Sequence, residues 1–385
     1  MEGLRSASQR KLDKRAQHQT LRSLSVAPSS VDFWSNDYLG LAATASNETS
    51  SSISAEPSTA PAHAAGSTGS RLLSGNSALV ERVENDIASF HGFEAGLLFG
   101  SGYDANLGLL SCIAGRTDSL LLDELAHASL IDGARLSPAR RLHFRHNDLD
   151  DLAEKLRRAA EERPSGNSIV VVEGTYSMDG DHCPLQEMVD LCDRFDAGLI
   201  IDEAHSIGVV GDGGAGLVSS LGLQDRVAGC VYTFGKAVGY HGAIVVGGEW
   251  LRRYLINFCR PFIYSTAPPP ASVLAIQTQH QRMVEADTQR LSLRRNIERF
   301  RRLASQHLKN DAVELLVSDS PIQGLIAGDI EHCAKIESDL AAAGITVKAI
   351  LSPTVAVGSE RIRICIHSYN TAEEVDLLVE TMAAA

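Results

Sequence analysis

The chain of 385 residues is 44% hydrophobic and 22% charged, and it carries a formal net charge of −13 at pH 7. This length accommodates one large and one smaller domain, and the acidic balance argues against binding to nucleic acid or to an anionic membrane. No apolar run is long enough to span a bilayer, and the first residues lack the apolar core of a secretory signal. We therefore expect a cytoplasmic protein that binds neither nucleic acid nor membrane.

The seven cysteines are scattered along the chain and include no C-x-x-C pair. This pattern favours a reducing compartment and argues against structural disulfides. His182, Cys183 and Cys192 lie near one another in sequence, but their spacing fits no common zinc pattern. We therefore expect no metal site.

The first 65 residues contain too few large apolar side chains to form a core of their own. Residues 8–24 are predicted to form a polar helix, and residues 31–35 an extended segment that leads into a turn at 36–40. Residues 42–65 are rich in Ser, Thr, Ala and Pro, a composition typical of a connector without regular structure. We assign residues 1–65 to an N-terminal helix, an extended arm and a Ser/Ala-rich connector.

Residues 66–270 show the alternation of short apolar runs and amphipathic segments that is typical of a doubly wound, mostly parallel α/β sheet. Amphipathic helices are predicted at 76–90, 147–163 and 185–195, and a further helix begins near Asp104. The apolar runs read as strands that are buried on both faces, namely 97–99, 119–123, 169–172, 199–201 and 230–232. We expect this region to form the large, cofactor-binding domain.

Chemically reactive side chains follow the last two of these strands. Asp202 and His205 come directly after one apolar run, and Thr233 and Lys236 come directly after the next. Because ligands of open parallel sheets bind beyond the carboxyl ends of the strands, these four side chains are expected at one rim. The set suits pyridoxal phosphate, which needs a lysine amine and an acid against its pyridinium nitrogen. The glycine turn before the helix near Asp104 would cradle the phosphate.

These residues have two other interpretations. Lys236 could be a solvated loop residue, and the letters DEAH at 202–205 also spell a helicase ATPase motif. A helicase requires a phosphate-binding loop of the form G-x-x-x-x-G-K-[ST], and no segment of the chain matches it, since Ala237 follows Lys236. The sequence therefore argues against a helicase.

The last part of the chain has a different pattern of predicted helices and strands. A long, arginine-rich helix is predicted at 271–308, after a run of three prolines. Short strands are predicted beyond it at 313–317, 322–327, 345–350 and 361–366. The last helix opens with a capping box formed by Thr371 and Glu374. We expect residues 271–385 to form a small C-terminal α+β domain.

Eight short motifs occur in this chain in an order and at spacings that resemble one enzyme family. They are SNDYLGL, GSTGSRLLSGN, HASL, EGTYSMDGD, DEAH, TFGKA, IYST and RIRI. Together they resemble the α-oxoamine synthases, which are pyridoxal-phosphate enzymes of the fold-type I aminotransferase superfamily. The resemblance extends from Leu12 to Leu378, and it implies a large doubly wound, mostly parallel sheet domain followed by a smaller α+β domain.

The resemblance assigns cofactor contacts residue by residue. Lys236 matches the lysine that binds pyridoxal phosphate covalently, Asp202 the partner of the ring nitrogen, and His127 the imidazole stacked over the ring. His205 matches a group near the phenolic oxygen and completes the expected catalytic set. Further cofactor contacts are implied for Gly102, Tyr103, Ser177, Ala204, Thr233, Ser265 and Thr266. The last two match residues that reach the phosphate of a neighbouring subunit, so a homodimer with shared active sites is implied.

The resemblance also implies a reaction, the decarboxylative condensation of an amino acid with an acyl thioester. L-Alanine and a pimeloyl thioester are the favoured substrates. Substrate contacts are implied for Arg22, Asn36, Ser70, His127, Thr354 and Arg363. Arg363 would bind the amino-acid carboxylate, Arg22 and Thr354 would contact the acyl chain, and Ser70 would leave room for the methyl group of alanine. Glu173 matches an acid near the site, and the sequence assigns it no role.

Other activities of the same fold stay open. The chain could use a different amino acid or acyl thioester, as aminoketobutyrate ligase, 5-aminolevulinate synthase, sphingoid-base enzymes and secondary-metabolite enzymes do. It could also be a non-catalytic regulatory subunit, although the presence of Lys236, Asp202 and His205 argues against this. The sequence does not decide whether the thiol carrier is coenzyme A or a carrier protein.

Overall fold

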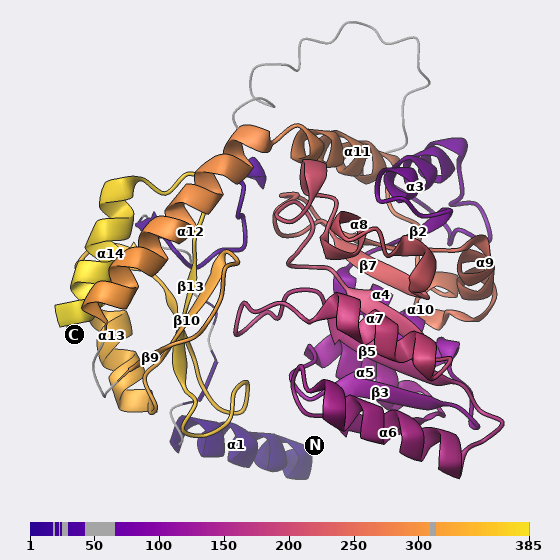
Figure 1. Ribbon diagram of the computed structural model, residues 1–385, viewed down its shortest axis with the longest axis horizontal. Helices are drawn as coiled ribbons and strands as arrows, with labels where there is room; N and C mark the ends of the chain where they lie inside the picture. Colours follow the sequence, from indigo (N-terminus) through magenta and orange to yellow (C-terminus); the bar gives the residue numbers. More distant parts are fainter. Residues whose placement is uncertain (18–19, 23, 25–29, 43–65, 309–312, 385) are drawn as a thin grey trace, which may run out of the picture. The chain divides into compact units, whose positions relative to one another are not determined.

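The structure is a computed structural model of the chain (Figure 1). It describes residues 1–385 except 18–19, 23, 25–29, 43–65, 309–312 and 385. The chain forms two compact units. The larger unit contains residues 36–177 and 181–292, and the smaller unit contains residues 1–35, 178–180 and 293–385. Among the described helices, none combines the length and the apolar character that a membrane span requires.

The larger unit is built on a seven-stranded sheet with the order β2-β8-β7-β6-β5-β3-β4. Its strands are β2 (Ala95–Phe99), β3 (Ser119–Asp123), β4 (Arg140–Phe144), β5 (Ser168–Glu173), β6 (Gly198–Asp202), β7 (Gly229–Thr233) and β8 (Ala243–Gly247). The pairs from β7 through to β4 are parallel, whereas β8 is antiparallel to both of its neighbours. This sheet confirms the predicted doubly wound, mostly parallel α/β architecture.

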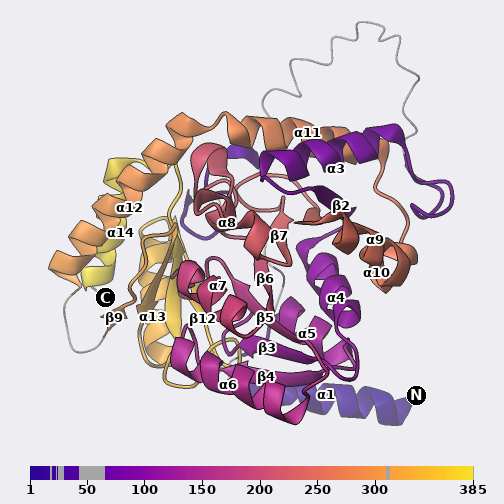
Figure 2. The ribbon, with the colours of Figure 1, turned by 45° about the vertical axis from the view of Figure 1, so that its right-hand side comes forward.

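Helices cover both faces of this sheet (Figure 2). They are α3 (Ala78–Phe90), α4 (Gly102–Ile113), α5 (Ala128–Leu136), α6 (Leu149–Glu162), α7 (Leu185–Arg194), α8 (Leu217–Ser220), α9 (Glu249–Phe258), α10 (Arg260–Ile263) and α11 (Pro270–Val284). Two 3₁₀ turns, Asp212–Gly214 and Gln224–Arg226, lie between β6 and β7. α12 (Asp287–His307) continues from the larger unit into the smaller one.

One face of the sheet packs against α4, α5 and α9. Leu120 and Leu122 of β3 are fully buried there together with Leu109, Leu130 and Leu255 of these helices. Alternate residues of a strand point to opposite faces, so an uninterrupted apolar run fits a strand that is covered on both sides. Full burial of one such side chain contributes about 1.5–3 kcal/mol to folding. The apolar runs therefore hold the polar residues that follow them at a fixed edge.

The smaller unit contains a four-stranded antiparallel sheet with the order β12-β13-β10-β9. Its strands are β9 (Glu314–Leu315), β10 (Ile322–Ile326), β12 (Lys348–Ile350) and β13 (Arg361–Cys365). Two further strands, β1 (Val31–Asp32) and β11 (Ile345–Thr346), pair in parallel. The helices of this unit are α1 (Glu2–Gln17), α13 (Ile330–Ala342) and α14 (Ala372–Ala384). The predicted capping box of the last helix is confirmed, because the side chains of Thr371 and Glu374 bond to each other's backbone N–H groups.

The units differ from the division expected from the sequence. Residues 36–42 and 271–292 belong to the larger unit, and residues 178–180 belong to the smaller one. The connector predicted at 42–65 lies almost entirely outside the described residues. The first helix, predicted at 8–24, spans Glu2–Gln17. β4 and β8 were not among the predicted strands. β4 mixes basic and apolar residues, whereas β8 is a short apolar run that could have been recognised.

The single helix predicted at 271–308 is wrong, since the chain breaks between α11 and α12. The buried Arg290 explains the break: its guanidinium donates to the carbonyl oxygens of Met283 (2.7 Å) and Val284 (2.8 Å) at the end of α11. It also pairs with Asp287 at 2.7 Å. The last carbonyl groups of a helix lack partners within that helix, and this side chain satisfies two of them. A hydrophobic period that continues through both helices hides the break.

Replacing Arg290 should therefore destabilise the protein. The Arg290→Ala variant leaves two carbonyl groups without these donors, and we expect it to lose about 3 kcal/mol of unfolding free energy. Urea unfolding followed by circular dichroism measures the loss. Arg295→Ala, at an exposed position of the same helix, is the matched control and should change stability by less than about 0.5 kcal/mol. Equal effects of the two substitutions would contradict this role for Arg290.

Candidate active site

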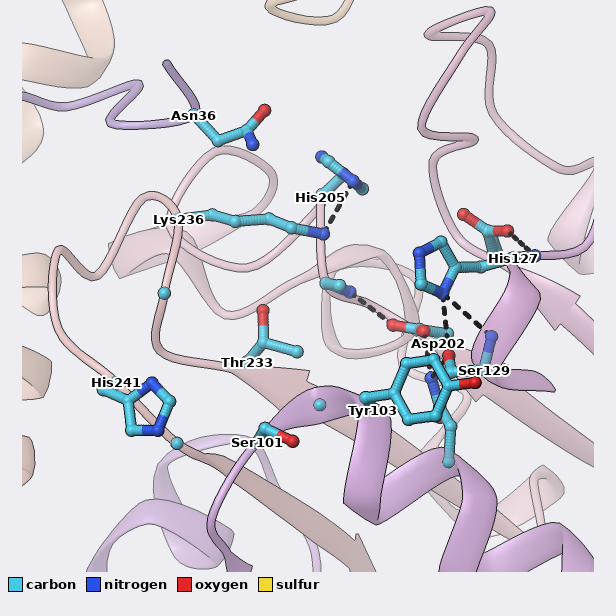
Figure 3. Close-up of a pocket in the computed structure, with 16 residues that line it drawn as sticks. Asn36, Ser101, Tyr103, His127, Ser129, Asp202, His205, Thr233, Lys236 and His241 are labelled. Carbon is cyan, nitrogen blue, oxygen red and sulfur yellow. Dashed lines mark hydrogen bonds between the residues drawn. The ribbon is translucent and has the colours of Figure 1, made fainter. Parts of the chain in front are cut away.

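Lys236 lies in the turn between β7 and the antiparallel β8, and its amine points toward His205 (Figure 3). The turn is held by a bond from the Tyr240 amide to the Phe234 carbonyl. Gly239 has a positive φ of 73°, and a Cβ atom there would lie 2.5 Å from the amide nitrogen of Ala42. Glycine is therefore needed at this position, because both its conformation and the close approach exclude a side chain.

A chain of hydrogen bonds runs from the amine of Lys236 across the site. Lys236 Nζ lies 2.6 Å from Nε2 of His205, and Nδ1 of His205 lies 2.7 Å from the hydroxyl of Tyr38. The Tyr38 hydroxyl in turn donates to Oδ1 of Asn36 at 3.1 Å. Only one arrangement lets every group in this chain donate in the same direction: Nε2 of His205 accepts from the amine and Nδ1 carries the proton. His205 therefore acts as an oriented acceptor beside the lysine.

Asp202 ends β6 and is held by groups from two elements. Its Oδ1 accepts from the backbone N–H of Ala204 at 2.9 Å, and its Oδ2 accepts from the side-chain amide of Asn106 on α4 at 2.6 Å. The same amide donates to the hydroxyl of Ser129 at 3.0 Å. The carboxylate is buried, so its orientation is fixed by hydrogen bonds and not by solvent.

His127 is the residue that precedes α5, and its ring lies on the opposite side of the cavity from Lys236 (Figure 3). Its Nδ1 accepts from the backbone N–H of Ser129 at 3.2 Å, which leaves the proton of the neutral ring on Nε2. Burial lowers the pKa of His127, the charge of Asp202 raises it and that of Lys236 lowers it, with a net downward shift. The imidazole is therefore a neutral hydrogen-bond donor at neutral pH.

Glu173 is a buried carboxyl group beside this histidine. Its Oε1 accepts from the backbone N–H of His127 at 2.6 Å, and it lies opposite Asp202 in the pairing of β5 with β6. Burial and the negative charge of Asp202 raise the pKa of Glu173 to about 8. At neutral pH it is mostly protonated, so Asp202 does not face a second full negative charge.

The amino terminus of α4 forms the lower edge of the cavity. The helix begins at Gly102, two residues earlier than predicted, and Ser101 caps it by accepting from the backbone N–H of Asp104. A Cβ atom at residue 102 would lie 2.4 Å from Cγ2 of Thr233, so glycine allows the helix end to approach β7 closely. Exposed N–H groups at the start of a helix bind phosphate well.

One cavity of about 300 Å³ brings most of the predicted cofactor residues together. The residues predicted from the sequence that line it are Asn36, Gly102, Tyr103, His127, Glu173, Asp202, Ala204, His205, Thr233 and Lys236. Its other lining residues, none of which was among the predicted site residues, are Ser101, Asn106, Ser129, Gly235, His241 and Gly242. Asn106 could have been found, because it lies one helical turn after Gly102 in the predicted phosphate-binding helix.

The remaining predicted residues lie elsewhere. Ser177 is in the loop after β5 and does not line the cavity. Ser70 is in a turn, where its carbonyl oxygen accepts from the backbone N–H groups of Leu73 and Gly75. Ser265 and Thr266 are exposed and line a separate small cavity of the larger unit.

Three predicted substrate contacts belong to the smaller unit. Arg22 and Thr354 line one cavity of about 490 Å³ there, with Nη2 of the arginine 3.4 Å from the threonine hydroxyl. Arg363 is buried on β13, and its Nη1 lies 2.9 Å from the sulfur of Cys365. Arg22 and Thr354 are therefore brought together, as contacts to one ligand require.

The chain matches the family described as "Aminotransferase class I and II" over residues 28–382. It is 40% identical over 398 aligned residues to an 8-amino-7-oxononanoate synthase of Emericella nidulans, with 99% of this chain and 95% of that protein covered. The structure resembles an 8-amino-7-oxononanoate synthase from Francisella tularensis, with 28% identity, a TM-score of 0.73 and 92% and 97% of the two chains covered. It also resembles a serine palmitoyltransferase solved with pyridoxal phosphate, with 28% identity, a TM-score of 0.80 and 92% and 87% of the chains covered.

The cavity fits pyridoxal phosphate. In the described part of the chain, Oγ1 of Thr233 and Oδ1 of Asn106 are buried cavity atoms without a hydrogen-bond partner. Buried polar atoms are rarely left unpaired, so a polar ligand is expected to satisfy them. An amine, a fixed carboxylate and a helix start on three sides match the aldehyde, ring nitrogen and phosphate of this cofactor. Of the described residues, no group of three or more His, Cys, Asp or Glu is arranged to hold a metal ion.

A partly buried charge network holds the loop that follows β5. Nδ1 of His146 lies 3.0 Å from Oδ1 of Asp123 at the end of β3, and its Nε2 lies 2.8 Å from Oδ2 of Asp181 in the loop. The ring packs edge-on against Tyr176. Although burial lowers the pKa of His146, its hydrogen bonds to the two carboxylates raise it to about 10. His146 is therefore an imidazolium at neutral pH.

This network predicts a specific pH dependence of stability. The folded pKa of about 10 lies above the ordinary value of 6.5, so the stabilisation is fully present below pH 6.5 and is lost as the pH rises toward 10. We expect the unfolding free energy of His146→Gln to be lower than that of the parent protein at pH 6.5, and the two to converge by pH 10. Urea unfolding at several pH values measures this, with the exposed His143→Gln as the control. A constant difference across this range would rule out the charged network.

Proposed function

Because the chain belongs to the aminotransferase class I and II family, we propose that it condenses L-alanine with a pimeloyl thioester to give 8-amino-7-oxononanoate, a step of biotin biosynthesis. Pyridoxal phosphate is its cofactor, and the chain is a C-acyltransferase of the α-oxoamine synthase type. The observation that carries the proposal is the cavity in which Lys236, His205, Asp202 and His127 meet, in a chain with 40% identity to a relative of this activity.

Different residues would hold different parts of the cofactor. Lys236 would bind its aldehyde carbon, and Asp202, fixed by Asn106, would accept from its ring nitrogen. The start of α4 and the hydroxyl of Thr233 would hold its phosphate. When bound, pyridoxal phosphate supplies an electron sink for negative charge at the α-carbon of the amino acid. The negative charge of Asp202 maintains this property, because it favours a proton on the ring nitrogen.

The amine of Lys236 is the base of the proposed mechanism. With the amino acid held by the cofactor, Nζ of Lys236 would remove the α-proton, and the acceptor Nε2 of His205 would orient this amine. The Nε2 proton of His127 is available to the substrate carboxylate from the other side of the cavity. The α-carbon then attacks the thioester carbonyl, the thiol leaves and carbon dioxide is lost. Protonation of the α-carbon completes an α-amino ketone.

Four residues would set the selectivity for the substrates. Arg22 and Thr354 present a guanidinium and a hydroxyl in one cavity, which suits the distal carboxylate of a pimeloyl chain. Arg363 would bind the carboxylate of the amino acid, and the small Ser70 would favour alanine. A second candidate is a sibling α-oxoamine synthase with another amino acid or acyl chain. The similarity to serine palmitoyltransferase, with a TM-score of 0.80, favours this alternative.

A homodimer is part of the proposal. Ser265 and Thr266 are exposed and lie outside the central cavity, as expected of residues that complete the site of a partner subunit. Ser177 would reach the phenolic oxygen of the cofactor from the loop after β5. The cytoplasmic location stays a prediction from the sequence.

A substrate matrix tests the proposed function. L-Alanine, glycine and L-serine are each combined with pimeloyl, succinyl and palmitoyl thioesters of coenzyme A, and free thiol and carbon dioxide are measured. We expect the highest kcat/KM for alanine with pimeloyl-coenzyme A, and no turnover by Lys236→Ala, which lacks both the covalent anchor and the base. A preference for serine with the palmitoyl thioester would establish the alternative. A repeat with pimeloyl-carrier protein identifies the thiol carrier.

Arg22 provides a test of the acyl chain. We expect Arg22→Ala to raise KM about tenfold for pimeloyl-coenzyme A, the loss of about 1.4 kcal/mol of binding, and to leave KM for an uncharged heptanoyl thioester unchanged. Arg5→Ala, at an exposed position of α1 outside the cavity, serves as the control. Equal increases for both thioesters would remove the argument for a dicarboxylic chain.

A further inference from the structure

The loop between β5 and α7 contains a short segment that packs with the smaller unit. Residues 178–180 belong to that unit, although the residues on either side belong to the larger one. Nη1 of Arg361 on β13 lies 2.6 Å from Oδ1 of Asp179, and the hydroxyl of Ser318 donates to the carbonyl oxygen of Gly180 at 2.9 Å. A Cβ atom at Gly180 would lie 2.1 Å from the carbonyl oxygen of Ile322 on β10, so the segment packs directly on this sheet.

The ion pair between Asp179 and Arg361 is largely shielded from water. The side chains of Asp179 and Arg361 are 22% and 7% exposed. Arg361 also donates from Nε to the carbonyl oxygen of Ser359 at 3.1 Å, which fixes the plane of its guanidinium. Shielded charge pairs with defined geometry are strongly destabilised when one partner is removed, unlike exposed pairs. This pair therefore fixes the distance between the loop segment and β13.

Both partners stand two residues from a side chain that the proposed function uses. Arg361 and Arg363 occupy alternate positions of β13 and so lie on the same face of the strand. Arg363 is the proposed ligand of the amino-acid carboxylate. On the loop, Ser177 is the proposed contact to the cofactor and precedes Asp179 by two residues. The ion pair thus joins the two backbone segments that would present these groups.

The loop is also tied at its base. Tyr176 donates through its backbone N–H to the carbonyl oxygen of Asp181 at 2.9 Å, and Thr175 forms a β-bridge with His182. His146 holds the carboxylate of Asp181 from the larger unit. These bonds fix both ends of the loop. The contact of Asp179 with Arg361 then restrains the segment between Ser177 and Asp181.

We propose that the Asp179–Arg361 ion pair is a positioning device that holds the loop segment 178–180 in register with the strand that carries Arg363, for binding of the amino acid. Neither partner is a catalytic residue, since both act through the backbone segments they join. The part of this inference that concerns the amino acid rests on the proposed function. A change in position of about 1 Å is enough to reduce catalysis on the order of a hundredfold, so loss of the pair should affect amino-acid use specifically.

Steady-state kinetics tests the proposal. We expect Asp179→Asn and Arg361→Gln each to raise KM for L-alanine by about tenfold or more, with KM for the thioester unchanged. Asp179→Glu keeps the charge and should recover part of the loss. The control is Asp376→Asn, which breaks an ion pair with Arg299 in the same unit whose side chains are each 34% exposed, and it should leave both KM values unchanged. Equal increases in the two KM values, or a fall in thermal stability alone, would overturn the proposal.

Hydrogen exchange tests the same pair without any turnover. In the protein without substrate, Asp179→Asn should accelerate amide exchange in residues 176–181 and 361–365 about tenfold or more, whereas Asp376→Asn should not. The double variant Asp179→Asn/Arg361→Gln should be no worse than either single variant, because the two side chains act as one unit. Unchanged exchange in both segments would refute the positioning role even if the parent enzyme is active. Altered exchange in an enzyme that does not condense alanine would instead refute the proposed function.

Discussion

The active site depends on one structural constraint, namely that β6 and β7 are parallel neighbours that end at the same edge of the sheet. Their pairing places Asp202 at the end of one strand and Thr233 at the end of the next. The turn after β7 then returns the amine of Lys236 to within 2.6 Å of His205, which follows Asp202 in the chain. The pairing of β6 with β7 therefore places Asp202 and Lys236. Burial of apolar residues stabilises this pairing, and the site itself does not.

The site keeps like charges apart. Asp202 and Glu173 are cross-strand neighbours, and two buried carboxylates at this distance would repel each other. Because burial and Asp202 raise the pKa of Glu173 to about 8, the pair carries close to one negative charge at neutral pH. His127 is kept neutral by burial. The result is a cavity in which the charge of Asp202 is available to a cationic ring nitrogen.

The sequence predicted those parts of the fold and the site that depend on local patterns. The apolar runs before Asp202 and Thr233 are continuous and end in polar residues, so both the strands and their functional ends could be recognised. β4 and the break before α12 could not, because β4 lacks an apolar run and the break is made by a hydrogen-bonding side chain, Arg290, inside a continuous hydrophobic period. Tyr38 lies in the predicted turn and in the SNDYLGL motif, but neither pattern predicts its bond to His205, which spans 167 positions of the chain. Contacts of this kind follow from tertiary packing and leave no periodic signal.

The loop after β5 shows how a functional segment without regular structure can be ordered. Fixing the backbone of each residue costs roughly 1–2 kcal/mol, and the loop has few backbone hydrogen bonds of its own to offset this cost. Charge-assisted hydrogen bonds contribute about 1.5–3 kcal/mol each when they are shielded from water. Two bonds of this kind hold the loop. Asp181 bonds to His146 at the base of the loop, and Asp179 bonds to Arg361 within the segment 178–180. Two aspartates two positions apart are thereby paired with cations from different parts of the chain, so each end of the segment is fixed separately. Ser177 directly precedes this segment, so contacts between residues distant in sequence help to hold the backbone next to it.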